Sequence, residues 1–396
     1  MLYRPCSTLK YLYAPNSQRA FKHRPAWFPH RIPARTFYNQ SVEVKELTSL
    51  LKLSPLFRVI LGPPSSGKTA LVREVASQKR LDDTPEFHSL TINLRSVDTS
   101  EHGSFMKAFV KHAHMADSFR DVVSSISKVE ALGFSAKFRE TKISTESAAN
   151  IFEDFGNRLK PWKISHGSRP CVLIIDEANV FQEMSDEVKE AKMQVVFTSS
   201  DSFFKSWLKK HVNNAHFETL VVGDLPYMEA KDYFLHKVKN HPYLTKTNKD
   251  RLESVDFQIP FRITGGRMFF IKKYINHVHV FGYFENPMEF PPTQLAYTFM
   301  EDDLLGKAKT YTGETALEVC KLLVDSPGYV DYRKLSEELG NAVVEEMIQQ
   351  NILHFRPASA FSRDLYPPPS RSSVVTAQSK PALCAMEVLV KESRKQ

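Results

Sequence analysis

Long apolar runs are missing from this sequence of 396 residues. No stretch approaches the ~18 unbroken apolar residues of a transmembrane helix, so we expect no integral membrane segment. Cysteine is also scarce: the four cysteines are scattered and lack metal-ligand spacing, which excludes a disulfide framework and a cysteine metal site. Ordinary hydrophobic (42 %) and charged (25 %) fractions indicate a globular protein. The length predicts roughly two to three domains.

Acidic residues are absent before Glu43, whereas residues 1–42 contain seven lysines and arginines. A basic, acid-free N-terminus is typical of a mitochondrial transit peptide, which we assign to residues 1–36. We therefore expect a mitochondrial (matrix) protein; the alternative is a disordered basic arm on a cytoplasmic one. Without residues 1–42 the balance is 46 basic against 45 acidic residues, so bulk charge gives no reason to expect nucleic acid as a partner.

Apolar segments that predict strands alternate with patterns that predict helices along the first 225 residues. Cys171–Ile175 is a continuous apolar run, which is typical of a strand buried on both faces. Alternating strands and helices predict an α/β fold with a parallel sheet and crossover helices. The strands expected by this pattern are 55–62, 88–94, 171–175, 195–198 and 219–222.

A phosphate loop follows the first of these strands. Its pattern is G-x-x-x-x-G-K-[ST], in which small residues let successive N–H groups point at phosphates. The helix that follows adds its positive N-terminal end. Lys68 would bind the β- and γ-phosphates of ATP, and the Thr69 hydroxyl would bind Mg²⁺. The expected nucleotide contacts are Gly62, Pro63, Pro64, Ser65, Ser66, Gly67, Lys68, Thr69 and Ala70.

Two acids end the apolar strand Val172–Ile175 about a hundred residues later. Asp176 would hold Mg²⁺, and Glu177 would activate the attacking water as a general base. The glutamate beside the aspartate favours ATP hydrolysis over transfer to a small molecule. The motif pair therefore predicts an ATPase.

Taken together, these motifs resemble the additional-strand class of P-loop NTPases, which includes AAA+ and STAND ATPases, and within it the archaeal-type ATPase branch. The resemblance implies a three-layer sandwich (residues 37–225), a helical lid (226–305) and a C-terminal winged-helix domain (306–396). Phe37-Tyr38-Asn39-Gln40 resembles the motif F-x-N-R at the N-terminus of that family's ATPase domain, and this resemblance places Asn39 near the adenine. Gln40 replaces the arginine that is usual there.

The resemblance also implies sensor residues. Ser199 and Ser200 follow the strand that carries the polar sensor 1 residue in such proteins, and Arg267 lies where a sensor 2 arginine is expected. Each has an alternative: the serines could cap the next helix, and Arg267 could be a surface residue at a helix start.

The C-terminal pattern predicts three helices, two wing strands (352–355 and 373–377) and a closing helix (380–391). A winged helix suggests DNA binding. However, the third helix (341–350) carries Glu345 and Glu346 and no lysine or arginine. We therefore favour packing or contact with an unidentified protein partner over DNA binding.

Arginine is absent from Cys171 to Asp250, the region in which ring-forming AAA+ motors usually carry an arginine finger. Lysine is not an equivalent replacement. The leading hypothesis is therefore a nucleotide-driven conformational switch with slow hydrolysis. An AAA+ motor or chaperone and an ATP-controlled nucleic-acid-binding protein are the alternatives. Self-association stays open, because Arg251, Arg262 or a partner could supply the finger.

Overall fold

The computed structural model describes residues 41–394 except for 54–55, 98–103, 117–118, 125–144, 166, 168, 179–192, 202–203, 205–207, 209, 211–216, 305–307, 360–362 and 370–371. The chain divides into two units, Met1–Thr36 and Phe37–Gln396, and every described residue belongs to the second. The N-terminal arm and Asn39 therefore lie outside the described residues. Within the described part, no helix is long and apolar enough to cross a membrane.

A five-stranded parallel sheet forms the core, which we define as residues 41–225, and confirms the predicted α/β fold. The strand order is β2-β3-β4-β1-β5, so β4 lies between the strand before the phosphate loop and the strand before Asp176. The strand β4 is thus inserted between these two strands. The strands are β1 (Phe57–Leu61), β2 (His88–Asn93), β3 (Cys171–Asp176), β4 (Gln194–Ser199) and β5 (Phe217–Val221).

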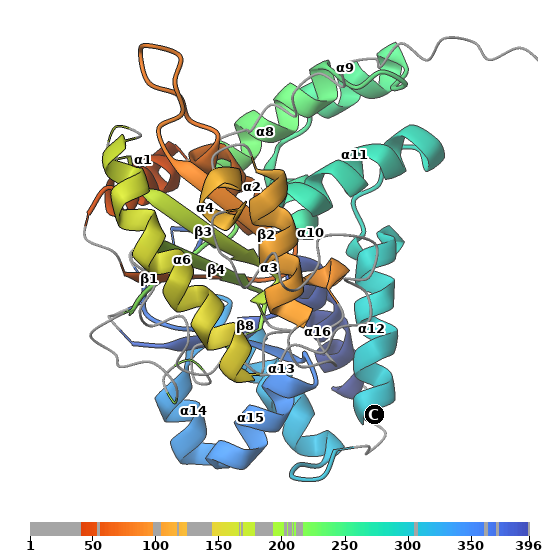
Figure 1. Ribbon diagram of the computed structural model, residues 1–396. Coiled ribbons are helices and arrows are strands. Elements are labelled where there is room, and N and C mark those ends of the chain that lie inside the picture. The colour runs from red at the N-terminus through yellow and green to blue at the C-terminus, as the bar shows by residue number, and fades with distance from the viewer. Residues whose placement is uncertain are drawn as a thin grey trace, which may run out of the picture. The chain divides into compact units, whose positions relative to one another are not determined.

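Helices cover both faces of this sheet, because alternate residues of each central strand point to opposite sides. On one face, Val59 and Leu173 pack with α3 (Ser104–Met115), α4 (Arg120–Ser124) and α6 (Thr145–Ser165); α3 and α6 cross in front of the sheet in Figure 1. On the other face, Ile60 and Ile174 pack with α1 (Ser41–Leu51) and α2 (Lys68–Ala76). The core is thus a three-layer sandwich.

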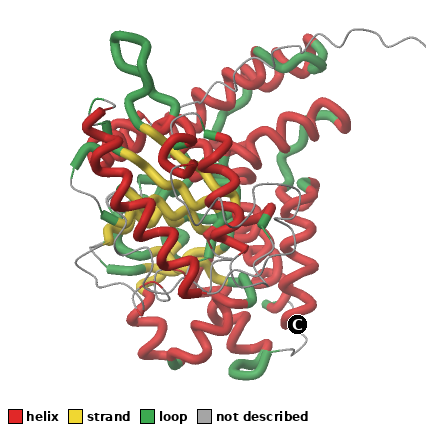
Figure 2. The backbone as a smooth tube through the Cα atoms, in the orientation of Figure 1, coloured by secondary structure: helices red, strands yellow, loops and turns green. Residues whose placement is uncertain are grey.

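Residues 226–304, here called the helical region, form helices only, as the red tubes of Figure 2 show. Residues 226–290 pack around a separate apolar cluster that includes Phe234, Phe257 and Tyr274, whereas Met300 belongs to the apolar cluster of the residues that follow. The helices are α8 (Tyr227–Lys239), α9 (Lys246–Ser254), α10 (Gln258–Thr264), α11 (Met268–Phe281), the short η6 (Pro287–Glu289) and α12 (Pro291–Leu304).

Residues 308–394, here called the C-terminal region, combine four helices with a three-stranded antiparallel sheet of order β6-β8-β7. The third helix, both wing strands and the closing helix are present at the predicted places. The strand β6 was not predicted from the sequence. The elements are α13 (Gly313–Asp325), β6 (Tyr329–Asp331), α14 (Tyr332–Leu339), α15 (Asn341–Gln349), β7 (Leu353–Arg356), β8 (Val374–Ala377) and α16 (Lys380–Ser393).

Candidate nucleotide-binding site

The loop between β1 and α2 has the backbone geometry of an anion-binding turn. Ser65 (φ 62°) and Gly67 (φ 102°) are both left-handed, and α2 begins directly after Gly67. Gly67 suits this position because it has no Cβ to strain. At Gly62, a Cβ would lie 2.2 Å from the carbonyl oxygen of Val222, so only glycine lets the two backbones approach. The loop is therefore shaped by its glycines to present main-chain N–H groups.

Lys68, the first residue of α2, is buried, with 6 % of its surface exposed. Its Nζ donates to the main-chain oxygens of Gly62 (2.8 Å) and Pro63 (2.9 Å), which are neutral acceptors. Burial lowers the pKa of Lys68 to about 8; the charges of Glu177 and Asp176 oppose this shift and those of Arg267 and Arg95 add to it. An anion bound in this loop would replace neutral acceptors by charged ones and restore the ammonium.

Two threonine hydroxyls meet on one oxygen of Asp176, at the carboxyl end of β3. Thr69 Oγ1 donates to Asp176 Oδ1 at 2.8 Å, which joins the P-loop helix to the acidic motif. Thr198 Oγ1, from β4, donates to the same oxygen at 2.5 Å. The structure thus brings Thr69 and Asp176 together, as a shared metal ligand set would need.

Glu177 lies beside this group in an uncommon backbone conformation, with φ at 61°. Its N–H donates to Thr198 Oγ1 at 3.3 Å. Its carboxylate is 2.7 Å from the guanidinium of Arg95, which follows β2 and is 71 % exposed. The sequence analysis did not identify Arg95.

The predicted sensor positions fall in different surroundings. Ser199 is buried, and its hydroxyl accepts a hydrogen bond from the Asp201 N–H at 3.0 Å, a local turn contact. The next helix, which the serines could cap, lies largely outside the described residues. Ser200 is half-buried. Thr198, one residue earlier, contacts both Asp176 and Glu177. Counting along the register could have found it: Ile175 pairs with Phe197, so the next residues are Asp176 and Thr198.

Arg267 precedes α11 and is buried rather than on the surface, with 5 % exposed. Its Nε donates to Asp224 Oδ1 at 2.8 Å, and its guanidinium lies over the Phe270 ring. Because its charge lowers the pKa of Lys68, Arg267 is within electrostatic reach of the phosphate loop. In this structure its guanidinium is bound to Asp224.

The C-terminal region also reaches this neighbourhood. His354, on β7, is buried, and burial together with the charges of Arg356, Arg267 and Lys68 lowers its pKa to about 3. A histidine of the last hundred residues therefore lies close enough to Lys68 to feel its charge. The sequence analysis did not identify His354.

The residues around the loop fit Mg·ATP. Hard oxygen donors, which Mg²⁺ prefers, come from Thr69 and Asp176, and an anion is favoured by the left-handed turn and by Lys68. No group of three or more metal-ligating side chains occurs among the described residues, so phosphate oxygens and water would complete the coordination.

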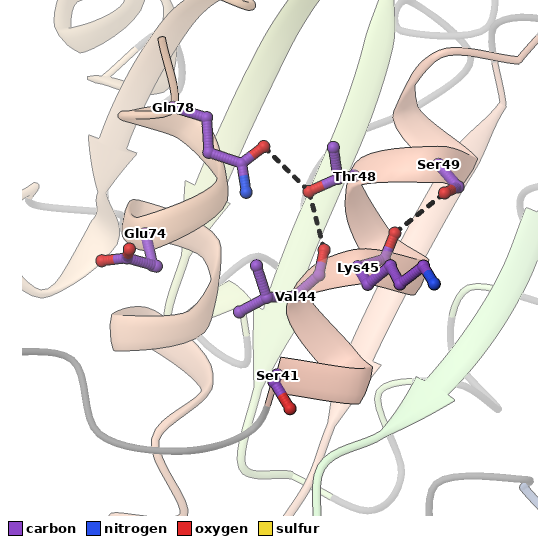
Figure 3. A pocket seen from close by; sticks show the side chains of 7 residues that line it. All are labelled: Ser41, Val44, Lys45, Thr48, Ser49, Glu74 and Gln78. Carbon is purple, nitrogen blue, oxygen red and sulfur yellow. Dashed lines mark hydrogen bonds between the residues drawn. The ribbon is translucent and has the colours of Figure 1, made fainter.

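A separate polar pocket lies between α1 and α2, away from the phosphate loop (Figure 3). The Thr48 hydroxyl lies in this pocket, within hydrogen-bond distance of the main-chain oxygen of Val44 (2.7 Å) and of Gln78 Oε1 (3.0 Å). None of the predicted site residues lines it. Its lining residues are Ser41, Val44, Lys45, Thr48, Ser49, Glu74 and Gln78.

Sequence comparison finds distant relatives that match most of the chain. The chain is 23 % identical over 347 residues to the uncharacterized ATP-binding protein MJ0439 of Methanocaldococcus jannaschii, covering 81 % of this chain and 91 % of the relative. A second such protein of that organism, MJ0074, is 21 % identical over 330 residues (78 % and 82 %). No family model matches the chain.

Among solved structures, the chain overlaps Cdc6p from Pyrobaculum aerophilum with a TM-score of 0.36 at 12 % identity, covering 93 % of this chain and 97 % of that one. Drosophila ORC bound to DNA overlaps with a TM-score of 0.33 at 11 % identity, covering 87 % and 93 %. Both TM-scores are below 0.5, so these overlaps are loose.

Proposed function

We propose that this protein is a P-loop ATPase that binds Mg·ATP between its core and its helical region. The observation that carries this proposal is the meeting of Lys68, Thr69 and Asp176 around one glycine-shaped loop. The names of the archaeal relatives, which are ATP-binding proteins, support it.

The side chains suggest a division of roles. Lys68 would bind the β- and γ-phosphates, and Thr69 and Asp176 would hold Mg²⁺, which supplies positive charge to the phosphate oxygens. Glu177 would accept a proton from the attacking water once it leaves Arg95. Thr198 would hold Asp176 and the Glu177 backbone in register.

Two substitutions test these roles. Lys68→Ala should lower ATP affinity by about 100-fold or more, because it removes a buried charge partner of the phosphates. Glu177→Gln should keep the affinity and lower turnover by about 10²–10⁴, because only the base is lost. Calorimetry and phosphate release measure the two effects; equal loss of binding in both variants would contradict the assignment.

We further propose a STAND-like switch rather than a processive motor. Arg251 is exposed, and its guanidinium is 3.9 Å from the exposed carboxylate of Glu285. It is therefore a surface cation that a neighbouring molecule could use. Basal turnover should be on the order of one per minute or less, by analogy with finger-free GTPases at about 10⁻⁴–10⁻² s⁻¹. The rate per molecule should not rise with protein concentration. A steep rise, lost in Arg251→Ala or Arg262→Ala, would instead support a self-assembling motor.

For the C-terminal region we propose packing or contact with a protein partner rather than DNA. The exposed residues of α15 are Asn341, Ala342, Glu345 and Gln349, none of them basic. Glu346 is bound within the fold, where it accepts from the backbone N–H groups of Lys309 and Thr310. A DNA titration at low salt tests this; tight binding that falls steeply with salt would contradict it.

We propose mitochondrial import for the basic N-terminal arm, because it carries seven positive charges and no acid before Glu43. Residues 1–36 fused to a fluorescent protein should reach the mitochondrial matrix. A diffuse cytosolic signal would contradict the proposal.

A further inference from the structure

Arg363, from the segment between β7 and β8, binds two carboxylates that are far away in the sequence. Its Nε and NH2 atoms donate to Glu43 at 2.8–3.0 Å. Its NH1 atom donates to Glu229 Oε1 at 2.7 Å. All three nitrogens of the guanidinium thus donate hydrogen bonds, which the planar guanidinium permits and the ammonium of a lysine does not.

The two carboxylates belong to different parts of the molecule. Glu43 is in the first turn of α1, in the core, and is 7 % exposed. Glu229 is in the first turn of α8, the helix that begins the helical region. Negative charge is favoured at both positions, because each is at the positive end of a helix dipole. One arginine of the C-terminal region therefore ties the core to the helical region.

A second ion pair of the C-terminal region contacts the short segment that joins β5 of the core to α8 of the helical region. Arg356 and Asp364 bind each other through two hydrogen bonds of 2.7 and 2.8 Å; Arg356 is buried, and the Asp364 side chain is 10 % exposed. They lie against Gly223, just after β5, where a Cβ would be 2.2 Å from Asp364 Oδ1. Separation of the core from α8 would have to displace this contact as well as Arg363.

This connection is also a wall of the candidate nucleotide site. Val222 touches Gly62 of the phosphate loop, and Asp224 holds Arg267, whose charge acts on Lys68. A nucleotide on the loop would therefore lie between groups of the core and groups of the helical region. Movement of these two parts away from each other would open this site, and the bonds of Arg363 oppose that movement.

We propose that Arg363 is a positioning residue of the nucleotide site, which holds α1 and α8 together and so slows the release of bound nucleotide. The inference rests on the proposed ATP binding. It assigns to the C-terminal region a control of nucleotide exchange that needs no contact between Arg363 and the nucleotide.

The test measures the dissociation rate of a fluorescent ATP analogue by stopped flow in the full chain. Glu229→Gln removes the negative charge that Arg363 binds on α8 and leaves only a neutral acceptor there, and Arg363→Lys keeps the positive charge but loses the fork. Both should dissociate about 3- to 10-fold faster, the range for a partly exposed charged hydrogen bond. Arg333→Gln is the matched control, since Arg333 is in the same region, is 86 % exposed and pairs with Glu337 on its own helix; its rate should equal that of the unsubstituted chain.

Gly223→Ala provides an independent variant, because its added methyl group would displace Asp364 without touching Lys68, Thr69 or Asp176. It should also speed dissociation. Hydrogen exchange should show faster opening of the first turns of α1 and α8 in Glu229→Gln and Gly223→Ala. The melting temperature of Glu229→Gln should stay close to that of the control.

The two proposals fail differently. If the unsubstituted chain binds no nucleotide, the proposed function is wrong. If it binds nucleotide and Glu229→Gln dissociates at the unsubstituted rate, the function stands and the role of Arg363 is overturned. A fall in melting temperature without a change in dissociation rate would make Arg363 purely structural and would also overturn it.

Discussion

Two buried cations lie on and just after the same strand, and their surroundings differ. Arg58, on β1, is 0 % exposed; it donates to the Leu50 carbonyl at 2.9 Å and pairs with Glu218 at 3.5 Å. Burial lowers its pKa, and Glu218 opposes the shift. Lys68, at the start of α2, donates its hydrogen bonds to the neutral main-chain carbonyls of Gly62 and Pro63. Burial of a cation is therefore not enough to indicate a binding site. A buried cation with neutral hydrogen-bond partners, in a loop rich in N–H groups, does indicate one.

The largest expected effect separates these two cations. Arg58→Ala should lower the free energy of unfolding by about 2–4 kcal/mol, because it leaves a cavity between α1 and the sheet and removes a hydrogen bond to Leu50. Its ATP affinity should stay within about three-fold. Lys68→Ala should do the reverse, losing affinity with no loss of stability, because it removes a desolvated ammonium.

Urea unfolding and calorimetry on the two variants measure both quantities. Loss of ATP affinity in Arg58→Ala at unchanged stability would erase the distinction between a structural and a functional cation.

Within the functional end of the sheet, the second prediction compares neighbours on β4. Thr198→Val keeps the shape but removes the hydroxyl that contacts Asp176 and Glu177, and should lower turnover by about 10- to 100-fold with little change in affinity. Ser199→Ala removes only the bond to the Asp201 N–H and should change turnover less than two-fold. Single-turnover phosphate release distinguishes them. The opposite order would favour Ser199 as the sensor that the sequence suggested.

Much of this fold and of the candidate site could be predicted from local sequence patterns. A five-residue strand that is apolar except for Arg58, a glycine-shaped turn and a helix start are adjacent in the chain, so Lys68 and Thr69 could be placed from residues 57–70 alone. Asp176 followed from the apolar run Val172–Ile175 that ends in two acids. These inferences need only short-range geometry.

The remaining contacts were beyond such reasoning. Arg363 meets Glu43 across 320 residues, and its partners are fixed by how three separately folded regions pack. Arg95 was missed because an exposed arginine after a strand has no distinguishing pattern. Arg267 was placed in the sequence by resemblance, but its bond to Asp224 depends on the turn between two helices.

The third prediction uses pH to separate the two cations. The pKa of Lys68 is about 8 in the folded chain, and bound phosphates would raise it. ATP affinity should therefore be flat below pH 8 and fall by about ten-fold per unit above it, as binding must take up a proton. Calorimetry at pH 7, 8 and 9 in two buffers measures the affinity and the proton uptake. Arg58 does not titrate in this range; constant affinity from pH 7 to 9 would contradict the assigned role of Lys68.

The same shift predicts a change in stability. The unfolded chain keeps the Lys68 proton up to its ordinary pKa of 10.5, whereas the folded chain loses it near 8. Folding therefore releases a proton between these values, and the unfolding free energy should rise with pH there, relative to Lys68→Met.

The smallest expected effect concerns Arg95, a cation that is neither buried nor held by fixed partners. It is 71 % exposed and 2.7 Å from the Glu177 carboxylate, so it holds the proposed base in an ion pair with water around it. Such pairs are worth up to about 1 kcal/mol, so Arg95→Ala should free the carboxylate and raise turnover by about two- to five-fold. ATP affinity should change less, because Arg95 has only a minor effect on the pKa of Lys68. Arg95→Lys should keep the slower rate, and phosphate release at saturating ATP measures all three proteins. A lower turnover in Arg95→Ala would mean that this arginine assists hydrolysis, so that the exposed cation and not only the buried one belongs to the reacting site.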